Sequence, residues 1–477
     1  MHFVVHRVRL LFYLLFIVWV KSDRSKLRPI CTGANDCQCT KDVVICNEIA
    51  FTDNDELEPL RTPMLNLKSS FTAREAQFRK NAIAYLRQGG ILPGHEKELV
   101  KLDFSFNHIY KIYPNAFDGM ENLRVLKLSH NRLKNFNWTA FDGSLSWDLN
   151  ELYLDFNQLK KLPNDAFRGL TNLKKLVLDY NEELQVTASV FGRSIQNLKS
   201  LSLDHCGFRT LDNNIFDELI SLEDLSLRGN PITSIPHALS NMPTLVFLDL
   251  SFTQITEIQN TSISNDPKLK TILLEDTHYL YAIHDCGFCG LPALEELSFY
   301  NASQLYSIDK HAFGYDRDEE KKPNLKRLDL QFANLSELPV ELFKEQKGIA
   351  VQLGGNPWNC TCENHFILKL DDGTSHIPPR CKYPKKLRNM TFDSLLPGSV
   401  CPRHVQIHRL FVSLAFLIAV LMVALLLYYL ISTDRLRLRN VFYRPDMPHI
   451  NYTNLSRDEP RNDVRNQPEV VASVQSS

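Results

Sequence analysis

The sequence lacks an excess of charge of either sign. It has 54 lysine and arginine residues against 55 aspartate and glutamate residues, and its formal net charge is −1. A protein that attracts nucleic acid or a strongly acidic partner through its overall field carries a large positive charge. The balance therefore gives no support to a nucleic-acid partner.

Sequence patterns of common catalytic sites are also missing. The chain contains no P-loop, no G-x-S-x-G and no H-E-x-x-H, which position phosphates, a nucleophilic serine or a zinc ion in the enzymes that have them. The pair His95-Glu96 is followed by Lys97-Glu98-Leu99 and so does not complete the last of these patterns. We expect a protein that is not an enzyme and that binds no cofactor.

Long apolar runs are few, and the first lies at the N-terminus. Within residues 1–22, His6, Arg7 and Arg9 precede an apolar run at 10–20. A basic segment, a short apolar run and a small-residue cleavage site are typical of a secretory signal peptide. An uncleaved anchor is the alternative, but a run of 11 residues is too short to span a bilayer.

The second apolar run covers residues 410–431 and contains no charged residue. A helix of this length extends roughly 33 Å, enough to cross a hydrocarbon core of ~30 Å. Arginines are more numerous after it than before it: Arg435, Arg437, Arg439 and Arg444 against Arg403 and Arg409. Positive charge on the C-terminal side favours a cytoplasmic C-terminus. We expect a single-pass type I protein of the plasma membrane, with an extracellular N-terminus.

Between these runs the sequence repeats the pattern L-x-x-L-x-L-x-x-N-x-L. One copy consists of Leu123, Leu126, Leu128, Asn131 and Leu133. The second apolar position recurs at 102, 126, 152, 176, 201, 225, 248, 272, 297 and 328, in steps of 23 to 26 residues with a last step of 31. A period held over so many copies indicates a repeat solenoid of the leucine-rich repeat class.

Each unit predicts a short strand whose leucines point inward and whose alternate residues point outward. The Asn position closes the turn, and its amide can satisfy buried backbone groups of adjacent coils. This predicted ladder consists of Asn107, Asn131, Asn157, Asn181, Cys206, Asn230, Thr253, Thr277, Ala302, Ala333 and Asn356. Cysteine and threonine replace asparagine only in part and alanine does not, so we expect the ladder to be weakest in the ninth and tenth coils.

These units, with phenylalanine before a Gly-Leu-like step (Phe167-Arg168-Gly169-Leu170), resemble the typical 24-residue repeats of animal extracellular leucine-rich repeat proteins. The resemblance implies an α/β-type solenoid in the shape of a horseshoe, with a parallel β-sheet on its concave face, cysteine caps at both ends and one transmembrane helix. It also implies a role in cell recognition, neuronal wiring or innate sensing.

Cysteines cluster at both ends of the array. Four lie at 31–46, and N-P-W-x-C-x-C at 356–362 is followed by two more. In a secreted segment the first cluster indicates two disulfides without selecting their pairing, and a zinc site is the alternative. The resemblance implies the pairs Cys31–Cys39, Cys37–Cys46, Cys360–Cys381 and Cys362–Cys401. Of the remaining three, Cys206 occupies a ladder position, and for Cys286 and Cys289 we expect a local disulfide and no redox activity.

The start of the array is irregular. Residues 64–67 suggest a first strand, but the distance to Leu102 is about one and a half repeats. Thr72 and Glu75 have the spacing of a helix capping box, and Phe78, Ala82 and Leu86 follow at helical intervals. We therefore predict an inserted helix near residues 72–88.

The predicted ectodomain contains N-x-S/T glycosylation sequons at Asn137, Asn260, Asn301, Asn334, Asn359 and Asn389. Asn301 and Asn334 lie next to the alanines of the ladder and could turn into it instead of carrying sugar.

Alternation along the strands identifies a candidate ligand face. It places Asp155, Asp179 and Asp204 in line, about 4.8 Å apart, with Tyr153, Phe156 and Tyr180 beside them. Adjacent carboxylates repel unless a cation or a basic partner offsets them, and aromatic residues beside charge are typical of protein interfaces. A calcium site is the smaller alternative, and a chance alignment of polar residues on a sheet is the simplest one.

The segment after the second apolar run is polar and proline-containing, and we expect it to be disordered. It is too short for a kinase or a Toll-type signalling domain. Tyr452, Asn454 and Leu455 match a tyrosine-based endocytic signal or, when Tyr452 is phosphorylated, a site for a cytoplasmic adaptor. Such short patterns also arise by chance.

The predicted organisation is a signal peptide (1–22), an N-terminal cap (23–60), 10–11 repeats (61–355), a C-terminal cap (356–401), a stalk (402–409), a transmembrane helix (410–431) and a disordered tail (432–477). We expect a receptor, co-receptor or adhesion molecule that binds an extracellular or cell-surface protein. A matrix-organising or structural membrane protein is the alternative, and either is compatible with a homo-oligomer.

Overall fold

The structure is a computed structural model. It describes residues 28–441 except 33–36, 50–64, 69–70, 90, 136–139, 142–147, 241, 261–262, 264–265, 315–322, 344–347, 371–376 and 402. The predicted signal peptide, the sequon at Asn137 and the tail motif at Tyr452, Asn454 and Leu455 lie outside the described residues. The chain divides into two units, one ending at Pro402 and one beginning at Arg403.

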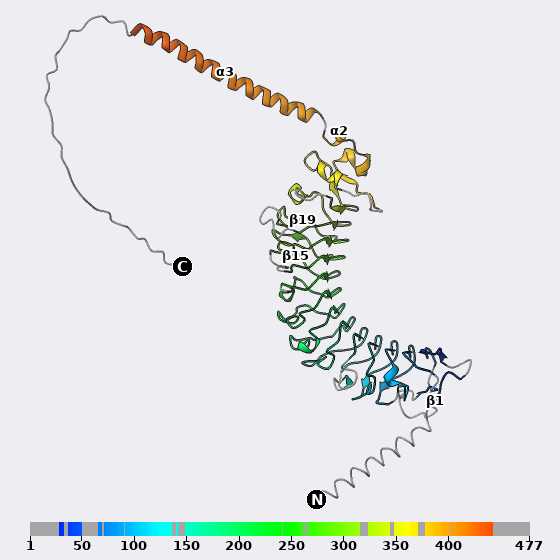
Figure 1. The fold of residues 1–477 in the computed structure, drawn as a ribbon. Helices are drawn as coiled ribbons and strands as arrows, with labels where there is room; N and C mark the ends of the chain where they lie inside the picture. The colour runs from blue at the N-terminus through cyan, green and yellow to red at the C-terminus, as the bar shows by residue number, and fades with distance from the viewer. Residues whose placement is uncertain are drawn as a thin grey trace, which may run out of the picture. The chain divides into compact units, whose positions relative to one another are not determined.

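The first unit is a solenoid with one long sheet along the inside of its curve (Figure 1). Within the described residues this sheet has 14 strands. They are β2 (Gln38–Cys39), β3 (Val43–Ile45), β5 (Glu75–Gln77), β7 (Lys101–Asp103), β9 (Val125–Lys127), β10 (Glu151–Tyr153), β11 (Lys175–Val177), β12 (Ser200–Ser202), β13 (Asp224–Ser226), β14 (Phe247–Asp249), β16 (Thr271–Leu273), β18 (Glu296–Ser298), β20 (Arg327–Asp329) and β21 (Ala350–Gln352).

The repeat pattern sets the register of this sheet. All neighbouring strands are parallel except β2 and β3, and each pairs the central residue of one coil with that of the next, as in Leu126↔Leu152 and Leu152↔Leu176. These central leucines are fully buried. Because side chains alternate along a strand, the two flanking residues face outward, and the predicted concave parallel sheet is confirmed.

The asparagine ladder joins successive coils as predicted. Asn131 shows the pattern: its Oδ1 accepts a hydrogen bond from Ile109 N (2.9 Å), and its Nδ2 donates to the carbonyls of Phe104 and Leu128 (both 3.0 Å). Thr253 reaches only the carbonyl of Leu250 in its own coil (2.7 Å). The ladder thus loses its contacts between coils where threonine and alanine replace asparagine.

Phenylalanine rings fill the convex half of the core. Phe117 and Phe141 stack at 5.8 Å, and Phe191 stacks between Phe167 (6.4 Å) and Phe216 (6.5 Å). Two small parallel sheets stand apart from the concave sheet: β6 (Tyr85–Leu86) with β8 (Lys111–Ile112), and β15 (Glu257–Ile258) with β17 (Ala282–Ile283) and β19 (Ser307–Ile308). The last residue of each strand is buried in the core. Short 3-10 helices complete the described coils: η2 (Glu96–Glu98), η5 (Arg193–Ile195), η6 (His237–Leu239) and η8 (Val340–Phe343).

The predicted helix near residues 72–88 is wrong, because this segment is a complete repeat with a strand, β5. Ala73, Ala76 and Phe78 are buried in the leucine positions, and Ala76 pairs with Leu102. Asn81 begins the ladder, donating to the carbonyl of Cys46 (2.7 Å). The apolar intervals taken for a helix belong to a repeat whose leucines are replaced by smaller or aromatic residues.

The N-terminal cap holds two disulfides, Cys31–Cys39 and Cys37–Cys46. The strand suggested at 64–67 exists as β4 (Leu65–Asn66), but it pairs with β1 (Arg28–Pro29) and does not join the concave sheet.

The C-terminal cap contains Cys360–Cys381 and Cys362–Cys401 around the buried Trp358. All four cap pairs are those that the resemblance implies. The cap also contains β22 (Trp358–Asn359), β23 (Cys381–Tyr383), η9 (His365–Lys369), η10 (Lys385–Leu387), η11 (Phe392–Ser394) and α2 (Pro397–Val400).

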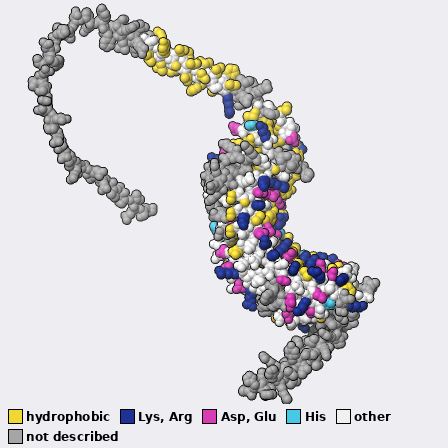
Figure 2. Space-filling model, viewed as in Figure 1, with side chains coloured by type: hydrophobic (Ala, Val, Ile, Leu, Met, Phe, Trp, Pro, Cys, Tyr) yellow, Lys and Arg dark blue, Asp and Glu magenta, His cyan; other side chains and the backbone are white. Residues whose placement is uncertain are grey.

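The second unit contains one long helix, α3 (Arg403–Val441). Its segment Arg409–Ser432 is long and apolar enough to cross a membrane, and none of it is buried in the protein. Hydrophobic side chains cover its visible face (Figure 2). The predicted stalk is therefore mostly helical, and the helix continues ten residues into the predicted disordered tail, because a helix begun in the apolar segment has nothing to end it before Val441.

Candidate functional site

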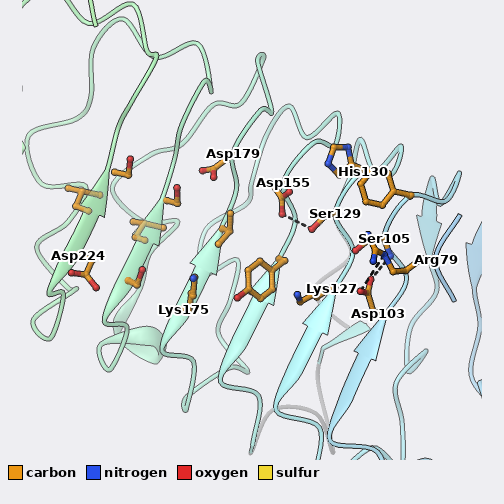
Figure 3. A pocket seen from close by; sticks show the side chains of 18 of the residues that line it. Arg79, Asp103, Ser105, Lys127, Ser129, His130, Asp155, Lys175, Asp179 and Asp224 are labelled. Carbon is orange, nitrogen blue, oxygen red and sulfur yellow. Dashed lines mark hydrogen bonds and ion pairs between the residues drawn. The ribbon is translucent and has the colours of Figure 1, made fainter. Parts of the chain in front are cut away.

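A groove of about 610 Å³ lies on the concave sheet over its N-terminal half. Side chains from successive strands point into it, and both acidic and basic groups line it (Figure 3). Lys127 and Lys175 lie on the strands themselves, whereas Asp155 and Asp179 lie just beyond the strand ends. The strand positions hold both signs of charge, because Asp103 is in register with Lys127 and Asp224 stands in the column of Lys175.

The three predicted aspartates form one of these columns, which we call the aspartate row: Asp155, Asp179 and Asp204. Each is partly buried and accepts a hydrogen bond from the next or the previous coil. Asp155 accepts from Ser129 Oγ (2.6 Å), Asp179 from Asp204 N (2.9 Å), and Asp204 from Ser226 Oγ (2.5 Å). These bonds order the carboxylates without neutralising them.

Burial makes the charged form of Asp179 and Asp204 costly. It raises the pKa of Asp179 above its usual value, and it raises the pKa of Asp204 to about 6 although the Ser226 hydroxyl acts in the opposite direction. The neighbouring carboxylates add to both shifts. A cation placed beside the row would lower the pKa values of Asp179 and Asp204 again.

Beside the aspartate row runs a stack of five rings, which we call the ring row: Phe106, His130, Phe156, Tyr180 and His205. Consecutive ring centroids lie 4.1 Å apart, or 4.5 Å in the last pair, with interplanar angles of 11–14°. Phe106, Phe156 and Tyr180 are 38–39% exposed. Large aromatic side chains left in water on an ordered surface are typical of binding sites.

The backbone turn that follows each strand positions the ring row. All five ring residues have φ between 52° and 60°, a left-handed conformation that costs roughly 1–2 kcal/mol for a residue with a Cβ. In return, each backbone N–H reaches a carbonyl of the next coil, as from Phe156 N to Asp179 O (2.8 Å) and from Tyr180 N to Asp204 O (2.7 Å). The same turn in every coil therefore brings the rings into register.

A neighbouring residue ends the ring row on each side. Arg79 lies over the first ring, 5.4 Å from the centroid of Phe106. At the other end the His205 ring lies over Gly229, where an added Cβ would be 2.2 Å from His205 Cε1. Only glycine fits there, so the row ends at this coil.

Tyr153 does not stand in the ring row, although the sequence analysis grouped it with Phe156 and Tyr180. It lies on β10 in the middle of the groove, with Lys127 Nζ 5.0 Å and Lys175 Nζ 5.5 Å from its ring centroid. Its hydroxyl donates to Glu151 Oε2 (2.8 Å), and burial together with this bond raises its pKa to about 12. Tyr153 thus lies between the two lysines of the groove.

Sequence reasoning missed Phe106, His130 and His205, and also Arg79. The signal was present, because each ring residue directly precedes a ladder position, as in Phe106-Asn107, His130-Asn131 and His205-Cys206. The calcium alternative finds no site: within the described residues no group of three or more His, Cys, Asp or Glu side chains could hold a metal ion.

The other predicted site residues are spread over the molecule. Cys286 and Cys289 form a disulfide on the convex side, and Cys206 is a buried free thiol. Asn260, Asn334 and Asn389 are exposed, whereas Asn301 and Asn359 are half-buried. Neither Asn301 nor Asn334 turns into the ladder, because Ala302 and Ala333 occupy its positions. Asn301 instead donates to Asp276 Oδ1 (2.6 Å).

Comparison with known proteins agrees with this architecture. The Leucine rich repeat family model matches residues 97–146, 148–191 and 196–255. The chain contains leucine-rich repeats, and its described residues form a leucine-rich repeat solenoid with disulfide caps and one candidate transmembrane helix.

Its relatives share part of their length with it. Tsukushi of Gallus gallus is 28% identical over 261 residues, which cover 53% of this chain and 59% of that protein. Toll-like receptor 7 of Drosophila melanogaster is 28% identical over 177 residues, 35% of this chain and 11% of that protein. This chain therefore spans less than two thirds of the length of either relative. Among solved structures, a chain of the octameric complex of Latrophilin 3, Unc5D and FLRT2 matches with 20% identity and a TM-score of 0.48, covering 77% of this chain and 98% of that one.

Proposed function

We propose that this protein is a cell-surface receptor, co-receptor or adhesion molecule that recognises a protein ligand through the groove on its concave sheet. The observation that carries the proposal is the ring row beside the aspartate row, because it combines exposed aromatic area with ordered charge on a rigid surface. Side chains held in place by stacking and by hydrogen bonds lose little conformational entropy on binding. Such a site suits protein recognition.

The proposed topology is type I in the plasma membrane. Five disulfides are typical of a protein folded in an oxidising compartment, which supports an extracellular first unit. The arginines that follow the apolar segment of α3 support a cytoplasmic C-terminus. In this topology the exposed sequons at Asn260, Asn334 and Asn389 are accessible to glycosylation.

A binding screen with the ectodomain, residues 23–401, tests this proposal. It should be run against a library of extracellular and cell-surface proteins. We expect a saturable protein ligand whose binding falls when the aspartate row is reversed to lysine, D155K/D179K/D204K. A ligand that binds equally to the reversed variant does not use the groove.

The second candidate function is a matrix-organising or structural role in which the tail only anchors the protein. The tail itself discriminates between the two. Deletion of residues 440–477 abolishes the response of cells to ligand if the protein is a signalling receptor. It leaves adhesion or matrix assembly intact if the protein has no signalling output. Loss of surface turnover on mutation of Tyr452 would instead assign the tail a sorting role.

A further inference from the structure

The ring row offers ring edges to solvent and not ring faces. Each inner ring lies between two neighbours at 4.1–4.5 Å, so both of its faces are covered. The exposed fraction of Phe106, Phe156 and Tyr180 therefore belongs to their edges. Aromatic edges carry the positive part of the ring quadrupole and pack against the face of another ring or against aliphatic groups. The partner group at this row is apolar and uncharged.

The aspartate row lacks a cation that the coils on either side of it possess. Asp103 lies 3.8 Å from the Arg79 guanidinium, which also covers the Phe106 ring. Asp249 lies 3.8 Å from the guanidinium of Arg228, which covers the Phe252 ring at 4.2 Å. At both flanks, an arginine of the chain thus bridges a carboxylate and a ring.

Between these flanks no such arginine is present. In the described part of the chain, Asp155, Asp179 and Asp204 form no ion pair with any lysine or arginine. They are nevertheless partly buried and held in place by the Ser129 and Ser226 hydroxyls. Partly desolvated carboxylates without a counter-charge gain most from a cation that a partner brings.

We propose that the ring row and the aspartate row together bind an extended segment of a partner protein in which basic side chains alternate with aromatic or aliphatic ones. This inference rests on the proposed function and specifies its ligand. Side chains alternate between the two sides of an extended chain, so such a segment can lie between the rows. Its basic side chains then meet the carboxylates while its apolar side chains meet the ring edges.

The spacing of the coils sets how many residues take part. Three carboxylates on adjacent coils cover roughly 10 Å, and side chains on one side of an extended segment repeat at about 6.6 Å. Two basic residues at positions i and i+2 therefore fit over the aspartate row. Arginine suits these positions better than lysine, because its planar guanidinium can form two parallel hydrogen bonds to one carboxylate.

Three synthetic ten-residue peptides test the proposal on the full-length protein in lipid nanodiscs. Their cores are Arg-Phe-Arg-Phe, the charge-reversed Glu-Phe-Glu-Phe and the ring-free Arg-Ser-Arg-Ser, each within the same Gly-Ser flanks. Fluorescence anisotropy gives the dissociation constants. We expect the first core to bind at least tenfold more tightly than either of the others. Absence of binding by the first core at 1 mM, or equal binding by the charge-reversed core, overturns the proposal.

Two variants assign the effect to the two rows. D155N/D179N/D204N removes the charge while its amide oxygens still accept the hydrogen bonds described above. F156N/Y180N removes two rings and places asparagine, which tolerates the left-handed conformation, at both turns. Each should weaken binding of the Arg-Phe-Arg-Phe core at least tenfold. The matched control Y279S/Y306S removes two tyrosines that are 56% and 59% exposed on later coils, and it should change the affinity less than twofold.

Thermal unfolding of each variant separates loss of binding from loss of fold. A control variant that weakens binding as much as the site variants overturns the proposal, as does a site variant that folds and binds normally. The proposed function can fail separately. If the screened protein ligand binds D155N/D179N/D204N and F156N/Y180N as tightly as the unchanged protein, this inference is wrong while the receptor role stands. If the peptide binds as expected and no protein ligand exists, the receptor role is wrong.

Discussion

Replacing one ladder asparagine tests how much the solenoid depends on contacts between its coils. In Asn131→Ala the buried N–H of Ile109 loses its 2.9 Å bond to Asn131 Oδ1. The carbonyls of Phe104 and Leu128 each keep another donor, Asn107 Nδ2 and Asn157 Nδ2, both at 2.9 Å. The Ser129 carbonyl, 3.2 Å from Asn131 Nδ2, keeps the Phe106 N–H at 3.0 Å. The change therefore leaves one buried donor unpaired, which costs about 1–3 kcal/mol, and removes three bonds whose acceptors each keep another donor. We expect the free energy of unfolding to fall by about 2–3 kcal/mol.

Thr253→Ala is the matched control, because Thr253 bonds only to the Leu250 carbonyl of its own coil (2.7 Å). Its loss should be about 1 kcal/mol. Chemical denaturation of the disulfide-intact protein, followed by circular dichroism, compares the two variants. Hydrogen exchange of residues 104–112 adds a local readout, because the Ile109 amide should lose protection only in Asn131→Ala. Equal destabilisation by the two changes, or unchanged protection at Ile109, would refute the role assigned to the ladder.

Three further changes have definite expected outcomes. Asp266 is fully buried, its Oδ2 has no hydrogen-bond partner among the described residues, and burial raises its pKa to about 7. The folded state therefore binds the proton more tightly than the unfolded state. As a result, the free energy of unfolding rises as the pH falls from about 8 towards 4. Asp266→Asn cannot ionise, so its stability relative to the unchanged protein should be about 3–4 kcal/mol more favourable at pH 8 than at pH 4 in urea titrations. Residue 229 has a φ of 69°, and Gly229→Ala places a Cβ 2.2 Å from His205 Cε1. This change should lower the free energy of unfolding by at least about 1 kcal/mol. It should also shift the resonances of the His205 ring in NMR spectra. Asn334→Gln should raise the electrophoretic mobility of protein from mammalian cells by one glycan, and unchanged mobility would show that this sequon is unused.

The sequence was sufficient for the architecture because the repeat is a local pattern copied many times. A leucine at each inward position dictates both the strand and its register, so the concave sheet and the ladder followed directly. The wrong prediction of a helix at residues 72–88 arose because this repeat lacks the usual leucines. Ala73, Ala76 and Phe78 replace leucines, and Ala82 and Leu86 happen to continue a helical interval. This segment becomes a strand because β5 pairs with β3 and β7. The spacing of apolar residues within one short segment does not reveal pairing with segments that are distant in the sequence.

The candidate site was only half predictable for a different reason. Alternation along a strand located the aspartate row, because outward positions follow from the repeat. The ring row lies in the turns, where left-handed backbone at Phe106, His130 and His205 stacks rings that are 24 to 26 residues apart in sequence. No rule of alternation places a side chain there. Arg79 and Arg228 were missed likewise, since each acts through a neighbouring coil.

The affinity of the full-length protein for its protein ligand, measured with the site variants and their control, tests the central claim most directly. The ligand should be the one that the ectodomain screen identifies. If the ring row and the aspartate row form the recognition site, D155N/D179N/D204N and F156N/Y180N each weaken binding at least tenfold while Y279S/Y306S changes it less than twofold. Binding that survives both site variants, with their fold intact, would contradict the account.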